Sequence, residues 1–156
     1  MKRILSVLEA VAACHTAEYE GKTVVFTNGC MDVLHPGHIR ALEKARSLGD
    51  ILIVGLNSDA SVRALKGDGR PINDQNFRAT MLAALRCVDM VVIFDEPTPL
   101  ELIKRIQPDV LVKGGDHQRD TIVGKAEVEA AGGLVVTVPT LPGYSTTGIV
   151  EKIRKG

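Results

Sequence analysis

The stretch FTNGCMDVLHPGHIRALEKARSLGD, residues 26–50, decides the fold class, because a strand-like run passes directly into a helix-like run. The run TVVFTN at 23–28 is apolar and β-branched, which is typical of a strand buried on both faces of a parallel sheet. Pro36 and Gly37 suit the start of a helix, predicted over 37–48, and Gly49 suits its end in a left-handed conformation. The stretch is therefore predicted to be a strand-to-helix junction.

The same alternation continues along the chain. Four further apolar runs predict strands at 50–56, 90–94, 109–115 and 133–139. Helices are predicted at 74–86, 98–106, 122–131 and 146–155, and an amphipathic helix at 2–13 precedes the first strand. Strands that alternate with helices form right-handed crossovers. The sequence therefore predicts an α/β fold: a doubly wound, Rossmann-like, five-stranded parallel sheet flanked by helices, with an extra N-terminal helix.

Length and composition limit the class of protein. We expect 156 residues to form one domain, with an N-terminal helical extension at 1–20 and a core at 22–154. The 19 basic and 19 acidic residues balance, which argues against a nucleic-acid partner. The three cysteines show no paired spacing, no secretory signal is visible, and no apolar run approaches the roughly 20 residues of a membrane span. A cytoplasmic protein without membrane contact is expected.

His35 and His38 stand three residues apart at the predicted start of a helix. Free backbone N–H groups and the positive end of the helix dipole favour an anion at such a place. Two imidazoles can add hydrogen bonds to phosphate oxygens, and Thr27, Asn28 and Gly29 just upstream can add donors and a close backbone approach. In a doubly wound sheet, ligands bind at the edge formed by the carboxyl ends of the strands, where this junction lies. A phosphate site is therefore favoured.

Other readings of this stretch are less well supported. Cys30, His35 and His38 are possible zinc ligands, but tetrahedral zinc needs a fourth, and no second pair has a suitable spacing. The two histidines could also be ordinary loop or core residues. The sequence contains no GxGxxG after the first strand, no GxxxxGK[ST] and no GxSxG, so it supports neither a dinucleotide oxidoreductase, nor a P-loop NTPase, nor a serine hydrolase.

Three further clusters suit an anion at the same edge. Segment 62–85 is expected to begin as a glycine-rich basic loop, and it contains Lys66, Arg70 and Arg78, of which Arg78 is expected to point inward. Such a charge run is usually a solvated surface, but at the carboxyl edge it could cover a triphosphate. LVKGGDHQRD at 111–120 offers a lysine beside two glycines, or simply a turn. PGYSTTGIVEKIR at 142–154 offers hydroxyl groups that also suit a helix N-cap.

These motifs together resemble those of the HxGH nucleotidyltransferase superfamily, which is cytidylyltransferase-like. Within it they are most similar to the D-glycero-D-manno-heptose 1-phosphate adenylyltransferase (ADP-heptose synthase) family in its stand-alone form. The segments that carry the resemblance cover nearly all of residues 22–154: FTNGCMDVLHPGH, LIVGLNSDASVRALKGDGRPIN, RATMLAALRCVDMVVIFDEPTPLELI, PDVLVKGGDH and GYSTTGIVEKI. In the last motif the basic residue of many superfamily members is replaced by Val150, so no role is expected for Arg154.

The resemblance implies a role for each matching residue. The residues expected to act in catalysis are His35, His38, Lys66 and Arg78. Those expected to bind the nucleotide are Thr27, Asn28, Gly29, Cys30, Gly37, Lys113, Gly114, Asp116, Tyr144, Ser145, Thr146 and Thr147. Those expected to bind the sugar phosphate are Asp32, Asn57, Asp59 and Arg70. No protein metal site is expected, because the Mg²⁺ that accompanies ATP would be held mainly by phosphates.

The implied reaction is AMP transfer from ATP to a heptose 1-phosphate, giving ADP-heptose and pyrophosphate for lipopolysaccharide core or S-layer glycans. The implied partners are these two small molecules and a second copy of the chain in a homodimer. Two alternatives stay open: a cytidylyltransferase acting on glycerol 3-phosphate or a related alcohol phosphate, and a nucleotide-binding module without catalytic activity. The residues alone do not decide the anomer of the sugar phosphate.

Overall fold

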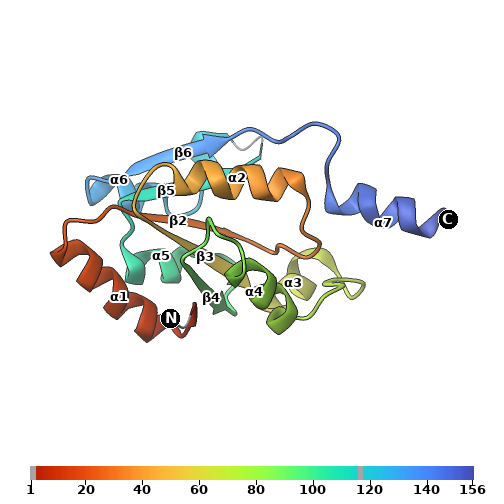
Figure 1. The fold of residues 1–156 in the computed structure, drawn as a ribbon, viewed down its shortest axis with the longest axis horizontal. Coiled ribbons are helices and arrows are strands. Elements are labelled where there is room, and N and C mark those ends of the chain that lie inside the picture. The colour runs from red at the N-terminus through yellow and green to blue at the C-terminus, as the bar shows by residue number, and fades with distance from the viewer. Residues whose placement is uncertain (1–2, 116–117) are drawn as a thin grey trace.

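The structure is a computed structural model that describes residues 3–115 and 118–156. Its centre is a parallel sheet of six strands in the order β1-β4-β3-β2-β5-β6 (Figure 1). The strands are β1 (Ile4–Leu5), β2 (Val24–Gly29), β3 (Ile51–Asn57), β4 (Met90–Phe94), β5 (Val110–Gly114) and β6 (Leu134–Val138). The chain builds outward from β2 through β3 to β4 and then crosses to β5 on the other side of β2. The order therefore reverses between β2 and β5, where a doubly wound sheet opens a ligand crevice.

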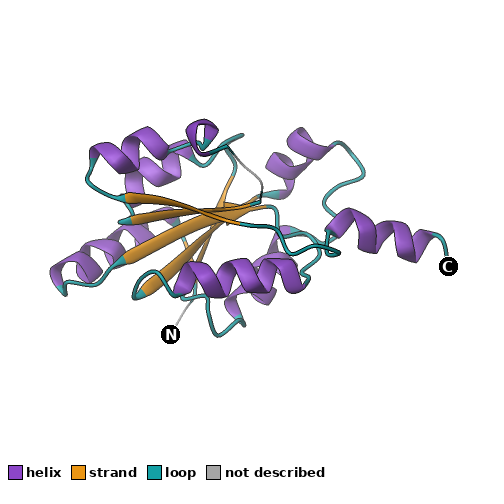
Figure 2. Ribbon diagram, turned by 90° about the horizontal axis from the view of Figure 1, so that it is seen from above, coloured by secondary structure: helices purple, strands orange, loops and turns teal. Residues whose placement is uncertain are grey.

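Helices cover both faces of the sheet, as Figures 1 and 2 show. One face is covered by α1 (Val7–Tyr19), α5 (Leu100–Ile106) and α6 (Lys125–Ala130), and the other by α2 (Pro36–Arg46) and α4 (Gln75–Ala83). A short helix, α3 (Asp59–Lys66), follows β3, a 3-10 turn spans Arg119–Thr121, and α7 (Thr146–Arg154) extends away from the sheet. The doubly wound α/β fold is confirmed.

The core consists of two apolar layers, one on each face of the sheet. Phe26, Ile53 and Val92 point into the layer beneath α1 and α5. Their sequence neighbours Val25, Val54 and Val91 point into the opposite layer, beneath α2 and α4. All six are fully buried, and each such side chain contributes about 1.5–3 kcal/mol. Burial on both faces explains why the strands read as continuous apolar runs.

The N-terminal segment differs from the prediction of a helix at 2–13. Ile4 and Leu5 form a sixth strand, which pairs with Val91 and Val92 of β4, and helix α1 begins only at Val7. Ser6 accepts a hydrogen bond from the Glu9 backbone N–H at 3.3 Å, and the Glu9 carboxylate accepts one from the Ser6 N–H at 2.7 Å. This capping box fixes the helix start. A two-residue strand is too short to show alternation, so its apolar pair was assigned to the helix.

Two other local predictions are wrong. Segment 62–85, expected to begin as a loop, instead begins inside helix α3 (Asp59–Lys66), whose N-cap Ser58 accepts a hydrogen bond from the Ser61 N–H at 3.2 Å. The loop begins only at Gly67, with φ 90°. Gly49 does not adopt a positive φ. A Cβ there would lie 2.6 Å from Val25 Cγ2, so glycine is required by a close approach to β2 and not by a left-handed cap.

Candidate active site

A cavity of about 430 Å³ lies at the carboxyl ends of β2 and β5, beside the point where strand order reverses. It is formed by the β2-to-α2 junction, the end of α3, the end of β5 and the segment that leads from β6 into α7. Fifteen of the predicted residues line it: Thr27, Asn28, Gly29, Cys30, Asp32, His35, Gly37, His38, Lys66, Lys113, Gly114, Tyr144, Ser145, Thr146 and Thr147. Four chain segments that are distant in sequence therefore meet at one place.

His35 is the N-cap of α2 and is held in a defined orientation. Its Nδ1 accepts a hydrogen bond from the Gly37 backbone N–H at 3.1 Å. A nitrogen that accepts carries no proton, so neutral His35 carries its proton on Nε2, which remains a donor. Burial lowers the pKa of His35. Gly37 is needed here, because a Cβ would lie 2.9 Å from the His35 ring.

His38 lies one helical turn further and stacks on His35, with ring centroids 3.8 Å apart and an interplanar angle of 30°. The pKa of His38 is lowered to about 4, mainly by burial and in addition by the neighbouring charges of His35 and Lys66. Among the described residues, His38 Nδ1 is the one buried side-chain nitrogen or oxygen without a hydrogen-bond partner. Such orphan groups are rare and often mark functional sites. Because the pKa of each histidine is lowered, both imidazoles are uncharged donors at neutral pH.

The lowered pKa of His38 predicts that stability decreases with acidity. The unfolded chain binds the His38 proton near pH 6.5, but the folded chain binds it only near pH 4. The free energy of unfolding therefore decreases as the pH falls from 6.5 to about 4. We expect the Tm of the wild type to fall more between pH 7 and pH 5 than the Tm of His38→Asn, which has no proton to bind. Thermal melts at both pH values measure this difference. Equal decreases for the two proteins would contradict it.

Two lysines give the cavity positive charge. Lys113 is the penultimate residue of β5, before Gly114, and burial lowers the pKa of its ammonium. Lys66 lies in the last turn of α3, and its charge acts on His38 across the cavity. Neither lysine has a carboxylate within ion-pair distance among the described residues. The cavity therefore combines two cations and two imidazole donors, while the Asp32 carboxylate that also lines it is paired with Arg70, and this arrangement suits a polyanionic ligand.

The segment before α7 brings hydroxyl groups to the opposite wall. Ser145 is the N-cap of α7 and accepts a hydrogen bond from the Gly148 N–H at 3.0 Å, which confirms the capping prediction. The Thr146 hydroxyl donates to the Val33 carbonyl at 3.3 Å, so this segment is tied to the junction that precedes His35. The N-termini of α2 and α7 thus lie at one cavity, and each favours negative charge.

Four predicted residues do not line the cavity: Arg70, Arg78, Asn57 and Asp59. Arg78, expected to act in catalysis, is 1% exposed and donates to backbone carbonyls and to Asp59. Arg70 forms an ion pair with Asp32 at 3.2 Å. The Asn57 amide donates to Ser61 at 3.0 Å. These polar groups are satisfied inside the protein. Asp116, predicted to bind the nucleotide, lies outside the described residues.

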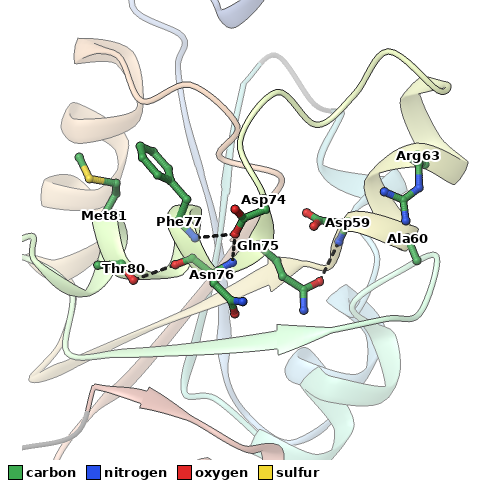
Figure 3. A pocket seen from close by; sticks show the side chains of 9 residues that line it. All are labelled: Asp59, Ala60, Arg63, Asp74, Gln75, Asn76, Phe77, Thr80 and Met81. Atoms are coloured by element: carbon green, nitrogen blue, oxygen red, sulfur yellow. Dashed lines mark hydrogen bonds between the residues drawn. The ribbon is translucent and has the colours of Figure 1, made fainter.

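A second, more open cavity of about 710 Å³ lies between α3 and α4 (Figure 3). Of the predicted residues only Asp59 lines it, and the Asp59 backbone N–H donates to the Gln75 side chain at 3.0 Å. Asp74 caps α4 through the Asn76 and Phe77 N–H groups. The Asp74 carboxylate therefore already accepts backbone hydrogen bonds, and the Asp59 carboxylate accepts one from Arg78.

Sequence reasoning missed part of the first cavity. Met31 adopts φ 45°, an uncommon value for a residue with a side chain, at the turn that leaves β2. Other lining residues that were not predicted are Ala41, Leu42, Val112, Gly115, Val138, Pro139, Thr140 and Leu141. The segment 138–141 follows directly from the predicted strand 133–139, whose carboxyl end had to reach this edge. That position was the signal that could have identified it.

The described residues offer little to a protein-bound metal ion. No group of three or more His, Cys, Asp or Glu side chains within 3–115 and 118–156 is arranged to hold one. Both oxygens of Asp32 accept hydrogen bonds from the Ile72 N–H, and one also accepts from the Asn73 N–H.

The chain matches the family model described as cytidylyltransferase-like over residues 26–152. It belongs to this cytidylyltransferase-like family. Among curated relatives, it is 59% identical over 150 residues to the bifunctional protein HldE of Geotalea uraniireducens and 61% identical over 137 residues to that of Rhodopseudomonas palustris strain BisB5. These alignments cover 96% and 88% of this chain but only 31% and 28% of the relatives. The chain thus spans under a third of their length.

Solved structures share the fold of this chain. A lipopolysaccharide core biosynthesis protein from Thermoplasma volcanium is 29% identical, with a TM-score of 0.63, over 78% of this chain and 98% of that protein. A pantoate-beta-alanine ligase from Francisella tularensis, in complex with an ATP analogue and beta-alanine, has a TM-score of 0.66 at 16% identity. It covers all of this chain and 79% of the ligase, and it shows the fold alone. No helix in the described part of the chain is long and apolar enough to span a membrane.

Proposed function

We propose that this protein transfers AMP from ATP to a heptose 1-phosphate and releases pyrophosphate, forming ADP-heptose for a lipopolysaccharide core or S-layer glycan. The observation that carries the proposal is the convergence of His35, His38, Lys66 and Lys113 on one cavity at the reversal point of the sheet. The resemblance of five sequence segments to heptose 1-phosphate adenylyltransferases supplies the substrate class. The 29% sequence identity to a lipopolysaccharide core biosynthesis protein is consistent with this substrate class.

The reaction would be an in-line attack by a phosphate oxygen of the sugar on the α-phosphorus of ATP. The attacking monoester is already an anion at neutral pH, so the chain needs no strong general base. Its residues would act by positioning and charge stabilisation. His35, held by its contact with Gly37, would direct the Nε2 proton toward a phosphate oxygen. Lys66 and the α2 N-terminus would offset the charge that grows on the departing pyrophosphate.

We propose Mg²⁺ as the companion of ATP. Held mainly by the phosphates, Mg²⁺ would supply charge neutralisation there. No described carboxylate cluster competes for this ion, and the carboxylates of Asp32 and Asp59 already hold other groups.

The test is pyrophosphate release with Mg²⁺ from ATP, CTP, GTP or UTP, each combined with both anomers of a heptose 1-phosphate and with glycerol 3-phosphate. We expect release only from ATP with a heptose 1-phosphate, and the active anomer is then identified. Release from CTP with glycerol 3-phosphate would replace the proposal by a cytidylyltransferase function, which the family description accommodates. Nucleotide binding by folded protein without release from any pair would indicate a binding module.

We also propose a cytoplasmic homodimer. Phe77 and Met81 lie one turn apart on α4 (Figure 3) and are 51% and 45% exposed. Ile72, in the loop before this helix, is 52% exposed. Exposed apolar groups that are close together often lie in protein interfaces. Light scattering should give twice the chain mass of 16.7 kDa, and a monomer at micromolar concentration would refute the dimer.

A further inference from the structure

The charged guanidinium of Arg78 is buried beside the wall of the cavity, next to Cys30. Its side chain is 0% exposed, although it stands in the first turn of α4. A buried charge is costly unless it is paired and its donors are satisfied. The partners that satisfy Arg78 therefore show what it does in the fold.

Arg78 donates to three separate chain segments. Nη1 donates to the Cys30 carbonyl at 2.6 Å and to the Asn57 carbonyl at 2.9 Å. Nε donates to the Asn73 carbonyl at 3.0 Å, and Nη2 to Asp59 Oδ1 at 2.7 Å. One planar group thus connects the segment after β2, the end of β3 with the start of α3, and the end of the basic loop.

A second set of contacts connects two of the same segments. The Asn73 side chain donates to the Asp32 backbone carbonyl at 2.7 Å, and the Asp32 carboxylate accepts from the Asn73 backbone N–H at 3.0 Å. Cys30 and Asp32 both line the cavity, and the chain from Cys30 to His35 forms neither a helix nor a strand. Arg78 and Asn73 therefore help to fix the position of this wall, together with the contacts of Asp32 with Arg70 and the Ile72 N–H.

We propose that Arg78 is a positioning residue: without touching substrate, it fixes the Cys30–Asp32 wall and the start of α3, and so aligns the nucleotide with His35, His38 and Lys66. This inference rests on the proposed function and replaces the predicted catalytic role of Arg78. A fork of fixed N–H donors performs this task and lysine cannot, because an ammonium does not present donors in one plane. Misplacement by about 1 Å is enough to lower a rate about a hundredfold.

The test compares Arg78→Lys and Asn73→Ala with Leu82→Ala, which removes a buried side chain from the same helix away from the cavity. Thermal melts give the folded fraction, calorimetry gives the Kd of α,β-methylene-ATP, and the assay gives kcat and KM. Per folded molecule, we expect Arg78→Lys to weaken nucleotide binding about tenfold and lower kcat about a hundredfold. Asn73→Ala should also raise the Kd and lower kcat, but by smaller factors than Arg78→Lys. Leu82→Ala should lower Tm alone.

Wild-type Kd, KM and kcat in folded Arg78→Lys would overturn the inference. If Arg78→Lys does not fold, Asn73→Ala decides, and unchanged constants in it would overturn the inference equally. Equal changes in Leu82→Ala would reduce Arg78 to a general structural role. Because Kd needs no turnover, a wild type that is inactive with every substrate pair refutes the proposed function but leaves the test of positioning intact.

Discussion

Replacing His38 by alanine is expected to lower the rate of pyrophosphate release about 10²- to 10⁴-fold, the range for loss of a positioned donor or charge-stabilising group. His38 stacks on His35, faces the charge of Lys66 and has a pKa lowered to about 4, so at neutral pH it acts as an uncharged donor. Its Nδ1 has no partner among the described residues, so the substitution breaks no hydrogen bond to that atom. The fold should therefore survive, with a Tm near that of the wild type.

The matched control is His15→Ala, which removes an exposed histidine from α1, away from the cavity. It should retain the wild-type rate. His38→Asn retains an N–H donor and should lose less activity than His38→Ala. Near-normal turnover by folded His38→Ala would remove His38 from the catalytic group and leave Lys66 and the helix N-termini as the stabilising elements.

The fold was largely predictable because its dominant signals are local. Val25 and Phe26 point to opposite faces, and both are buried, so β2 appeared as a continuous apolar run. The same holds for the other central strands. Edge strand β1 was missed because pairing with β4 gives order to a dipeptide that has no periodicity of its own. Helix α3 was missed because the glycines at 67 and 69 dominated the reading of the segment around it.

The cavity was predictable to the extent that its lining residues lie at or just after the carboxyl end of a strand. Thr27 and Lys113 were found this way, since β2 and β5 are neighbours. Arg78 shows the limit of that reasoning. Its position at the start of a helix indicated an inward orientation, which is correct, but the carbonyls of Cys30, Asn57 and Asn73 that receive it come from three segments. Only the folded arrangement distinguishes a buried connector from a ligand contact.

Lys66→Met is expected to lower the rate about 10²- to 10³-fold, as for loss of one preorganised charge-stabilising group. Lys66 ends α3 next to Gly67, and it lines the cavity from an exposed position. A surface substitution of this kind changes the free energy of unfolding by only about 0.5 kcal/mol or less, so the loss of rate should not reflect unfolding. Lys66→Arg keeps the charge and should retain part of the activity.

The substitution has a second consequence that does not depend on turnover. The charge of Lys66 is one of the causes that lower the pKa of His38, so its removal should raise that pKa toward the ordinary histidine value. An NMR titration of the His38 imidazole in wild type and Lys66→Met measures this shift, with Lys104→Met on α5 as the control that should leave it unchanged. A raised pKa with full activity would place Lys66 beside His38 but outside the reaction. A lowered rate with an unshifted pKa would place its ammonium on the substrate and away from the imidazole.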